Sequence, residues 1–583
     1  MDPERRVLLA IFLAFLVLYV WQALFVKPAP KPGAAGTATT TSVPATAGGR
    51  SSAGMPAAPG KPAAAAITLP SATAATPSPP GAAALVGETT ERDVRVETSD
   101  VIAVFTNRGA RLKSWRLKRY LDRDKHPQEL VDTEVQSQPL PFSLRTPDDR
   151  VTTTVNDAVY AVSGAPSGVS ASPFDLRFEY SDNAGVQVVK QFHFDPGSFI
   201  VTFRATVNDG TRAVTPEIVW GPAVGDVVEV SRYTKKAEGL LFTNGKVQRL
   251  QTKDIAKQSA YEGDFKYAGV DDNYFMTAAL FVGPAKISFQ PVAIPPPADS
   301  KDPPRDLLAF AIEPRAPDAP VKFFIGPKDF DVLTSIDAGA HEENVVVQAI
   351  DFGMFTILVR PLLWSLKRVN TYVGNYGWSI IILTILINGV MFPLRHKSVV
   401  SMRKMQEIQP EVKAIQDRYA KFKATDPAKQ KMNQELMALY KDRGVNPASG
   451  CVPMLLTMPV LFAMWSMLST AIELRGAPFV GWIHDLTSHD PLYITPVIMG
   501  ASQLWQQRLT PNTGADPAQQ KMMMFMPIIF TAMFLWLPAG VAIYYAVSNL
   551  WGIGQQYLTN YMIGPPKIRH VRPPGERQLK KKE

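Results

Sequence analysis

The chain has 583 residues, which is too long for one ordinary domain, and 46% of them are hydrophobic. Its single cysteine, Cys451, excludes an internal disulfide framework, and a structural zinc site is not expected because such sites usually combine several cysteines or histidines. The formal net charge is +9, but the basic residues gather beside apolar segments and at the C-terminus, as is typical of the cytoplasmic face of a membrane protein. We therefore expect no direct nucleic-acid substrate.

Residues 1–26 are predicted to form an N-terminal transmembrane anchor. Within them, residues 7–26 are apolar except for Gln22. About 20 residues, at a helical rise of about 1.5 Å each, match a hydrocarbon core of roughly 30 Å. A cleaved signal peptide is the alternative because two arginines precede the apolar run, but this run is longer than the usual signal core.

Residues 27–90 are predicted to be a disordered linker. They consist mainly of Ala, Pro, Thr, Gly and Ser and contain almost no large apolar side chain. Such a segment cannot bury enough surface to offset the entropy lost on ordering. We expect it to act as a flexible tether for the region that follows.

Residues 91–344 are predicted to form a water-soluble, all-β domain with the architecture of a β-sandwich. Short runs such as 94–96 and 151–155 alternate between apolar and polar residues, and Gly, Pro, Asn and Asp interrupt them. Residues 176–180 and 186–194 flank a turn-forming stretch and should pair as a hairpin. About 250 residues suffice for a substantial core, and no apolar stretch here approaches the length of a membrane span.

Residues 352–369 have apolar side chains at helical spacing together with basic residues, which predicts an amphipathic helix lying in the membrane interface. A buried helix of the soluble domain is the alternative, because Pro361 interrupts the pattern. Strongly apolar segments follow and bring the expected number of transmembrane helices to six. These five segments are 378–394, 452–472, 492–504, 522–537 and 541–562.

A basic helical hairpin is predicted at residues 396–443, where Asp426-Pro427 forms an N-cap and first-turn proline for its second helix. Residues 395–443 contain twelve Lys or Arg and the tail, 563–583, contains seven, so the positive-inside rule places both segments in the cytoplasm. With six spans, both termini are then cytoplasmic and residues 91–344 are periplasmic. The hairpin either presents a solvated charged face or attracts anionic lipids, at about 1 kcal/mol per charge.

Three segments resemble the YidC family of membrane protein insertases, in its Gram-negative form with a large periplasmic domain. Their motifs are Gly450-Cys451-Val452-Pro453, Trp482-Ile483-His484-Asp485-Leu486 and Leu537-Pro538-Ala539-Gly540. The resemblance implies a bacterial inner-membrane insertase and chaperone, not an enzyme, with a five-helix core at 378–562 around a hydrophilic groove and a periplasmic β-supersandwich. It implies no cofactor and no metal. Its expected partners are nascent membrane proteins, the Sec translocon and, through the tail and cytoplasmic loops, the ribosome.

The residues expected to line the substrate groove are polar residues of the second and last spans. They are Thr384, Asn388, Tyr544, Tyr545, Ser548 and Asn549. The alternative role for each is hydrogen bonding between helices. The family usually has an arginine where this chain has Asn388, so the groove keeps its polarity here but loses a charge that costs at least about 2.5 to 3.5 kcal/mol at mid-membrane. Arg395 and Lys397 lie nearer the cytoplasmic end, where snorkelling to the surface is the simpler expectation.

Two other classes of function compete with this interpretation. A small-solute transporter is disfavoured because we find neither acidic residues central in a span nor an internal repeat. A membrane-tethered enzyme or sugar-binding module is disfavoured because the histidines of the outer domain, His126, His193 and His341, form no recognisable motif. Such a module would also leave the basic hairpin and the polar span faces without a role.

Overall fold

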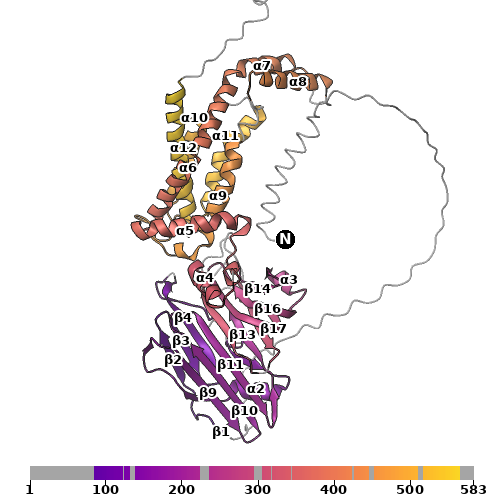
Figure 1. Ribbon diagram of the computed structural model, residues 1–583, viewed down its shortest axis with the longest axis vertical. Coiled ribbons are helices and arrows are strands. Elements are labelled where there is room, and N and C mark those ends of the chain that lie inside the picture. Colours follow the sequence, from indigo (N-terminus) through magenta and orange to yellow (C-terminus); the bar gives the residue numbers. More distant parts are fainter. Residues whose placement is uncertain are drawn as a thin grey trace, which may run out of the picture.

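The computed structural model consists of a β-rich part and a bundle of helices stacked end to end (Figure 1). It describes residues 84–564 except 123, 132–137, 224–235, 295–304, 317, 343, 423–425, 446–451 and 510–516. The predicted anchor, most of the predicted linker, Cys451 and the basic tail beyond residue 564 therefore lie outside the described residues. The end of the predicted linker differs from expectation, because residues 84–86 form a strand at the edge of the β-rich part.

The β-rich part contains two sheets that pack face to face, as the sequence predicted for a sandwich. The larger sheet has the order β1-β9-β10-β11-β19-β17-β16-β14-β15, and β6, β7, β12, β13 and β18 pair off this path. Its strands are β1 (Ala84–Val86), β6 (Ser143–Arg145), β7 (Ala161–Ser163), β9 (Phe174–Asp182), β10 (Val186–Phe194), β11 (Ile200–Asp209), β12 (Arg212–Val214), β13 (Glu217–Ala223), β14 (Glu238–Thr243), β15 (Lys246–Leu250), β16 (Ala260–Asp271), β17 (Phe275–Ile294), β18 (Arg305–Pro314) and β19 (Val321–Pro327). The smaller sheet, in the order β5-β4-β3-β2-β8, contains β2 (Asp93–Thr98), β3 (Val101–Thr106), β4 (Arg111–Leu121), β5 (Pro127–Glu129) and β8 (Val169–Ser170).

Aromatic side chains fill the space between the two sheets. Phe105 of the smaller sheet lies 4.8 Å, between ring centroids, from Phe192 of the larger one. Phe142 stands edge-on to Phe192 at 5.0 Å and to Trp220 at 5.0 Å. All four side chains are buried, so this aromatic cluster forms the centre of the sandwich core.

The predicted hairpin is confirmed, whereas one predicted strand is wrong. β9 and β10 pair antiparallel, and Gly185 in the connecting turn has a φ of +93°, which a residue with a Cβ rarely adopts. Residues 151–155 are not a strand but lie in helix α2 (Asp149–Asp157), where Val151 and Val155 are buried. The Asp148 side chain accepts a hydrogen bond from the Arg150 N–H and caps this helix. The domain is thus β-rich rather than all-β, since it also contains α3 (Thr252–Ile255) and α4 (Phe330–Gly339).

The helical part begins after the 3-10 turns η1 (Val346–Ala349) and η2 (Gly353–Phe355). Helix α5 lies across the end of the bundle that faces the β-rich part, and the hairpin α7–α8 caps the opposite end (Figure 1). The helices are α5 (Thr356–Val373), α6 (Tyr376–Glu407), α7 (Gln409–Arg418), α8 (Pro427–Asp442), α9 (Val452–Thr470), α10 (Ile494–Leu509), α11 (Pro517–Phe534) and α12 (Ala539–Ile563), with the short turn η4 (Ile472–Leu474) after α9. The predicted N-cap Asp426 is confirmed, since its side chain accepts the Ala428 N–H at 2.9 Å.

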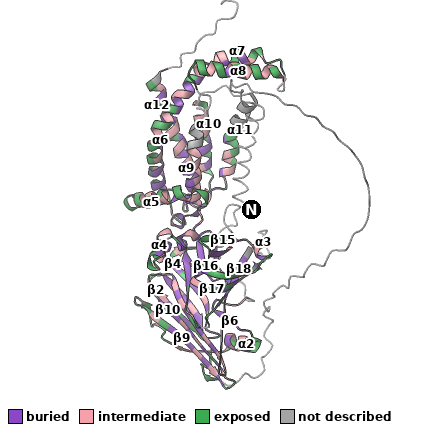
Figure 2. Cartoon of the chain, turned by 45° about the vertical axis from the view of Figure 1, so that its right-hand side comes forward, coloured by how far each residue is buried: buried purple, intermediate pink, exposed green. Residues whose placement is uncertain are grey.

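The apolar segments predicted as the last five spans correspond to α6 and α9 to α12, although residues 471–472, 492–493 and 535–537 of the predicted segments lie outside these helices. Of the described helices, α6 alone is both long and apolar enough by composition to cross a membrane, so six spans remain a prediction. Large apolar side chains nevertheless project from the outside of the bundle, where exposed positions are frequent (Figure 2). Examples are Val390 of α6, Ile498 of α10 and Ile529 of α11, which are 81%, 50% and 66% exposed.

Helix α5 carries apolar residues on two faces. Val359, Leu363 and Leu366 are buried, whereas Ile357 and Trp364 are 85% and 68% exposed. It packs against α6 and α9 rather than into the β-sandwich. An exposed apolar face beside an apolar bundle is what an interfacial helix requires, and it disfavours the alternative of a helix buried in the soluble domain.

Candidate functional site

A row of polar side chains lies inside the bundle where α6 faces α9 and α12. Asn388 is 2% exposed, and its Oδ1 accepts hydrogen bonds from Arg395 Nη1 at 2.8 Å and from Ser548 Oγ at 3.5 Å. Arg395 Nη2 donates to Thr457 Oγ1 of α9 at 3.3 Å. Thr384, one turn before Asn388, is fully buried. We call these five residues, Thr384, Asn388, Arg395, Thr457 and Ser548, the polar seam.

The spacing of the α6 residues explains why they share one face. Residues 384, 388 and 395 are separated by four and seven positions, which are close to one and two helical turns. Asn388 Nδ2 donates to Thr384 O at 2.8 Å, and Thr384 Oγ1 donates to Ile380 O at 2.6 Å. These bonds satisfy polar groups within α6 and leave Asn388 Oδ1 directed toward Arg395 and Ser548.

The six residues predicted for the groove do not form one group. Thr384, Asn388 and Ser548 belong to the polar seam. Asn549 instead donates to Ser502 Oγ of α10 at 3.1 Å, which matches the alternative role of a bond between helices. Tyr545 packs edge-on against Phe534 of α11 at 5.2 Å, so the α12 residue that contacts Asn388 is Ser548.

Tyr544 and Arg395 complete the surroundings of the seam. Tyr544 is buried and close enough to Arg395 for an electrostatic interaction. Arg395 itself was not among the predicted groove residues, because a basic residue near the end of a span is usually explained by snorkelling. The sequence signal that could have identified Arg395 is its spacing, which places it on the same helical face as Thr384 and Asn388.

The ends of α6 and α12 that lie away from the β-rich part are held together by further polar contacts. His396 Nδ1 lies 3.2 Å from Thr559 Oγ1, and Gln555 Nε2 donates to Phe392 O at 3.3 Å. Beyond them, Arg403 donates to Asn560 Oδ1 and to the carbonyl oxygen of Gly564, which follows the last residue of α12. An arginine at the C-terminal end of a helix also interacts favourably with the helix dipole. Helices α6 and α12 are therefore joined along most of their length.

The loop between α9 and α10 is folded around two aspartates at the opposite end of the bundle. Asp485, which belongs to one of the motifs noted above, accepts hydrogen bonds from Gly476 N, Thr487 N and Oγ1, and Ser488 Oγ. Asp490 is fully buried and accepts from Trp482 Nε1, Leu492 N, and Thr495 N and Oγ1. Hydrogen bonds to a charged acceptor are stronger than neutral ones, so this loop forms an ordered cover over that end of the bundle.

The β-rich part docks on this end of the bundle. Arg475 of the loop donates from Nη1 to Leu121 O at 2.7 Å and from Nη2 to Gln128 Oε1 at 2.8 Å. Its guanidinium also lies 5.2 Å from the centre of the Phe275 ring. Asn273 Nδ2 donates to Ser469 O, near the end of α9, at 3.0 Å. The predicted N-terminal tether suggests that the β-rich part moves freely relative to the helices, whereas these contacts hold the two parts together.

An ion pair on α5 adds to this dock. Lys367 Nζ lies 2.6 Å from Asp331 Oδ2 of α4 and 3.2 Å from Glu473 Oε1 of η4. Burial and nearby Asp329 raise the pKa of Glu473, and Lys367 opposes that rise. The three elements, α4, α5 and η4, are thereby tied together at the junction of the two parts.

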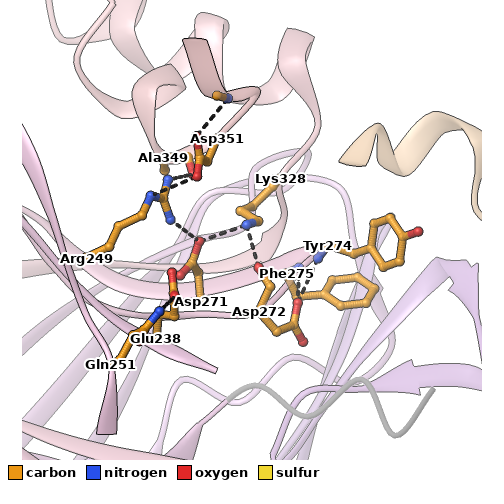
Figure 3. A network of polar contacts seen from close by, with 11 residues as sticks. Glu238, Arg249, Gln251, Asp271, Asp272, Tyr274, Phe275, Lys328, Ala349 and Asp351 are labelled. Carbon is orange, nitrogen blue, oxygen red and sulfur yellow. Dashed lines mark hydrogen bonds and ion pairs between the residues drawn. The ribbon is translucent and has the colours of Figure 1, made fainter. Parts of the chain in front are cut away.

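A buried ion network supports the dock from within the β-rich part (Figure 3). Asp271 Oδ2 lies 2.8 Å from Lys328 Nζ and 3.1 Å from Arg249 Nη1, and the Asp271 and Lys328 side chains are almost fully buried. Arg249 also donates from Nη2 to Ala349 O at 2.6 Å and lies 3.7 Å from Asp351. Because Ala349 and Asp351 immediately precede the helical part, the network fixes the chain where it leaves the sandwich.

A helical bundle with exposed apolar faces, a polar seam between its helices and a docked β-sandwich defines the protein as a helical membrane protein with a large extramembrane domain. Sequence models of two families match most of the chain. The family described as 60Kd inner membrane protein matches residues 368–565, and the YidC periplasmic domain matches residues 93–365.

Curated relatives match over nearly the full chain. The membrane protein insertase YidC of Syntrophus aciditrophicus is 34% identical over 96% of this chain and 99% of its own length. That of Geobacter metallireducens is 33% identical over 97% of this chain and 100% of its own. The chain belongs to the YidC family of membrane protein insertases, an inner-membrane family with a periplasmic domain, as the sequence motifs predicted.

Solved structures give weaker likenesses. A crystal structure of an active YidC insertase is 18% identical, with a TM-score of 0.34 over 82% of this chain and 94% of that one. A galactose mutarotase-like protein from Lactobacillus casei is 13% identical, with a TM-score of 0.24 over 40% of this chain. Neither score is high enough to support an argument about function.

Proposed function

We propose that this protein inserts newly made proteins into the inner membrane and assists their folding, and that the polar seam is the place where a client's hydrophilic segment is received. The main support for this proposal is the polar seam. Thr384 and Asn388 are buried, and the hydrogen-bonded Arg395, Thr457 and Ser548 are half-buried, in a bundle whose outer faces are apolar. Polar groups at such depth are costly and mark functional paths in membrane proteins.

The arrangement of the helices supports an opening on the α9 side of the seam. Helices α6 and α12 are joined by side-chain bonds from Asn388 down to Arg403, whereas α9 packs chiefly on α5 at the outer end. The Phe355 and Phe462 rings stack there at 5.7 Å. Movement of the cytoplasmic half of α9 would admit water to the seam. This water would form hydrogen bonds with a client's polar groups, which have no hydrogen-bond partners in hydrocarbon.

The orientation that we propose is six spans with both termini in the cytoplasm. The hairpin α7–α8 and the docked sandwich lie at opposite ends of α6, which agrees with basic residues on one side of the membrane and the β-rich domain on the other (Figure 1). The ordered loop around Asp485 and Asp490 then closes the seam on the periplasmic side. A client segment would enter from the cytoplasm and leave sideways into lipid.

The proposed partners are nascent membrane proteins, the Sec translocon, the ribosome and anionic lipids. The hairpin supports the last two. Its helices pack through a small apolar cluster that includes Val412, Ile415 and Leu436, and exposed ion pairs such as Arg418 with Glu435 bridge them. The lysines that remain on its surface can meet phosphates of lipid or of ribosomal RNA.

Cysteine labelling of the seam tests this function. In a Cys451→Ser background, Asn388→Cys is expected to react with a membrane-impermeant thiol reagent from the cytoplasmic side, and more strongly when a client is being inserted. Ser502→Cys, buried between α10 and α12, is the matched control and should stay unlabelled. Insertion of a small Sec-independent client in cells depleted of their own insertase is the activity assay.

Two results would contradict the proposal. One is an unlabelled Asn388→Cys together with a misfolded Asn388→Arg, because a seam that opens to water should hydrate that added charge. The other is a well-expressed wild-type chain that restores insertion of no client. Labelling of both cysteines alike would indicate a loosened bundle rather than a path.

A further inference from the structure

Helix α5 has a basic composition although it lies at the end of the bundle opposite the basic hairpin (Figure 1). Its 18 residues include Arg360, Lys367 and Arg368 and no acidic residue. Basic residues beside membrane spans usually gather on the cytoplasmic side, where the hairpin is proposed to lie. The basic residues of α5 therefore need a specific explanation.

Two of these residues have partners at the junction of the two parts. Lys367 forms ion pairs with Asp331 and Glu473. Arg360 Nη1 donates a hydrogen bond to Asn344 Oδ1 at 3.2 Å. Contacts within the protein therefore account for both side chains.

Arg368 is exposed and has no such partner. Within the described residues, no carboxylate or other hydrogen-bond acceptor contacts its guanidinium, which lies 5.1 Å from the centre of the Tyr372 ring. A planar guanidinium that faces an aromatic ring keeps its N–H groups free for an acceptor. Phosphate is an acceptor that arginine binds with two parallel hydrogen bonds.

The direction of Arg368 follows from the helical phase of α5. Val359, Leu363 and Leu366 are buried and mark the side that packs on α6 and α9. At about 100° per residue, Lys367 lies about 80° from Val359, toward the β-rich part, and Arg368 lies about 180° from Val359. Arg368 therefore projects sideways from the bundle, at the boundary between the β-rich part and the apolar helices. In a membrane this boundary is the layer of lipid headgroups.

Two aromatic residues flank Arg368 on the same face of α5. Trp364 and Tyr372 lie four positions before and after it, about one helical turn each way, and are 68% and 76% exposed. Ile357 extends this face and is 85% exposed. Trp and Tyr are enriched at membrane–water interfaces, where their rings lie among the headgroups. The face thus combines apolar anchoring with the charge of Arg368 at headgroup depth.

We propose that Arg368, between Trp364 and Tyr372, binds the phosphate of an anionic phospholipid, such as phosphatidylglycerol, in the leaflet on the side of the β-rich part. An anionic headgroup is preferred to the zwitterionic phosphatidylethanolamine, because the ammonium group of the latter competes with the guanidinium for the phosphate. The site is separate from the hairpin, for which lipid phosphates are proposed at the other end of the bundle. A lipid held here would fix the depth of α5 and, through Lys367, of the dock. The inference goes beyond insertion and holds whether or not a client is present.

The competing explanation is that Arg368 extends into water and has no preference among lipids. A fluorophore on Thr371→Cys, an exposed position next to the site, reports on nearby lipids in a chain that also carries Cys451→Ser. The full chain is reconstituted in vesicles of phosphatidylethanolamine and phosphatidylglycerol, at about three to one, so that the membrane is anionic. A nitroxide quencher is placed near the headgroup end of the acyl chains of either lipid, and the ratio of the two quenching efficiencies measures the preference of the site.

The labelled chain with Arg368 intact should show about a fivefold preference for phosphatidylglycerol, the factor that corresponds to about 1 kcal/mol per basic residue near an anionic membrane. Arg368→Gln should reduce the preference to near parity. Arg368→Lys should keep part of it, because a single ammonium group cannot form the two parallel bonds. The matched control is Arg360→Gln, which removes the same charge from the same helix and should leave the preference unchanged, since Arg360 contacts Asn344.

Several outcomes would overturn the inference. Equal quenching by the two lipids with Arg368 intact would show that no lipid is selected. An equal loss of preference in Arg360→Gln would assign the effect to the overall charge of α5. Loss of the preference on addition of inorganic phosphate, at constant ionic strength, would identify a site for free phosphate rather than for a lipid. If Arg368→Gln fails to accumulate, Tyr372→Leu decides: removal of the ring should lower the preference about twofold, and an unchanged preference would refute the site.

Discussion

Replacing Lys328 with methionine tests the buried network behind the dock. The change removes the ammonium group and keeps a side chain of similar length, and it leaves Asp271, whose side chain is 2% exposed, with Arg249 as its remaining ion partner. Removing one partner of a buried ion pair costs about 3 to 5 kcal/mol. Because Arg249 still neutralises Asp271, we expect the lower end, about 3 kcal/mol, for unfolding of the β-rich part.

The matched control is Lys113→Met in the same part of the protein. Lys113 pairs with Asp93 at 2.8 Å, but the two side chains are 42% and 52% exposed, and such surface pairs contribute about 0 to 1 kcal/mol. With an m-value of about 3 kcal/mol/M, Lys328→Met should lower the urea midpoint by about 1 M, and Lys113→Met by a third of that or less. Pulse proteolysis of the full chain in detergent measures both midpoints.

Equal midpoints for the two variants would refute this reasoning, because burial is what distinguishes the two lysines. A higher midpoint for Lys328→Met would also refute it. Such a result would mean that desolvation of the ammonium group costs more than its bonds return, as occurs in some buried ion pairs.

Four further predictions concern other parts of the chain. Burial and nearby Arg111 lower the pKa of Lys190 well below 10.5. The unfolded chain therefore binds a proton that the folded chain does not, and the stability of the fold should rise as the pH approaches about 10.5. Lys190→Met should flatten this rise, measured as urea midpoints between about pH 7 and 9. Asp490→Ala removes four hydrogen bonds and should destabilise the loop between α9 and α10 by about 2 to 3 kcal/mol, seen as faster proteolytic cleavage next to Trp482 at unchanged protein level. Deletion of residues 84–327 removes both sheets whole and should leave insertion of most clients intact, and loss of insertion of every client with the helices still assembled would contradict a separable membrane core. Cys451→Ser should insert clients normally, because the chain's single cysteine stands in no sequence motif of a reactive or metal-binding thiol, and a large loss at unchanged protein level would contradict this.

The deletion boundary illustrates what the structure adds to the sequence. The sequence pattern suggests a deletion of residues 94–314, but this deletion would leave β19 without its partners β11 and β17. Phe323, Phe324 and Ile325 of that strand would then lose their cover. Ending the deletion at residue 327 avoids this and keeps α4, whose Asp331 pairs with Lys367.

Sequence patterns predicted the fold correctly where the spacing of apolar residues matched either a helix or a strand but not both. The hairpin of β9 and β10, the N-cap Asp426 and the positions of the last five apolar helices follow from such patterns. The predicted strand at residues 151–155 was wrong because Val151 and Val155 are four positions apart, a spacing that suits both a strand and a helix. The threonines between them favour a strand. The deciding signal was Asp148, a helix cap that precedes the run.

The site was less predictable because it depends on helical phase and on side-chain direction. Sequence identified polar residues on α12, but whether Tyr545 or Ser548 faces Asn388 depends on how α12 is rotated against α6. The hydrogen bonds of Arg395 depend on acceptors from two helices, α6 and α9. Contacts of the dock, such as that of Arg475 with Leu121, join residues too far apart in sequence to leave a local pattern.

Helix α6 has 32 residues, with Pro393 inside it, and is about 48 Å long, whereas the hydrocarbon core is about 30 Å thick. In the proposed orientation, about three turns of α6 therefore extend beyond the bilayer and connect to the hairpin. A force on the hairpin is then transmitted along α6 to the polar seam. Because Arg403 grips the end of α12, the two helices must tilt as one body against α9. If the proposed ribosome contact is made by the hairpin, a force from the ribosome would act on the contact between Arg395 and Thr457 and favour opening of the path before a client arrives.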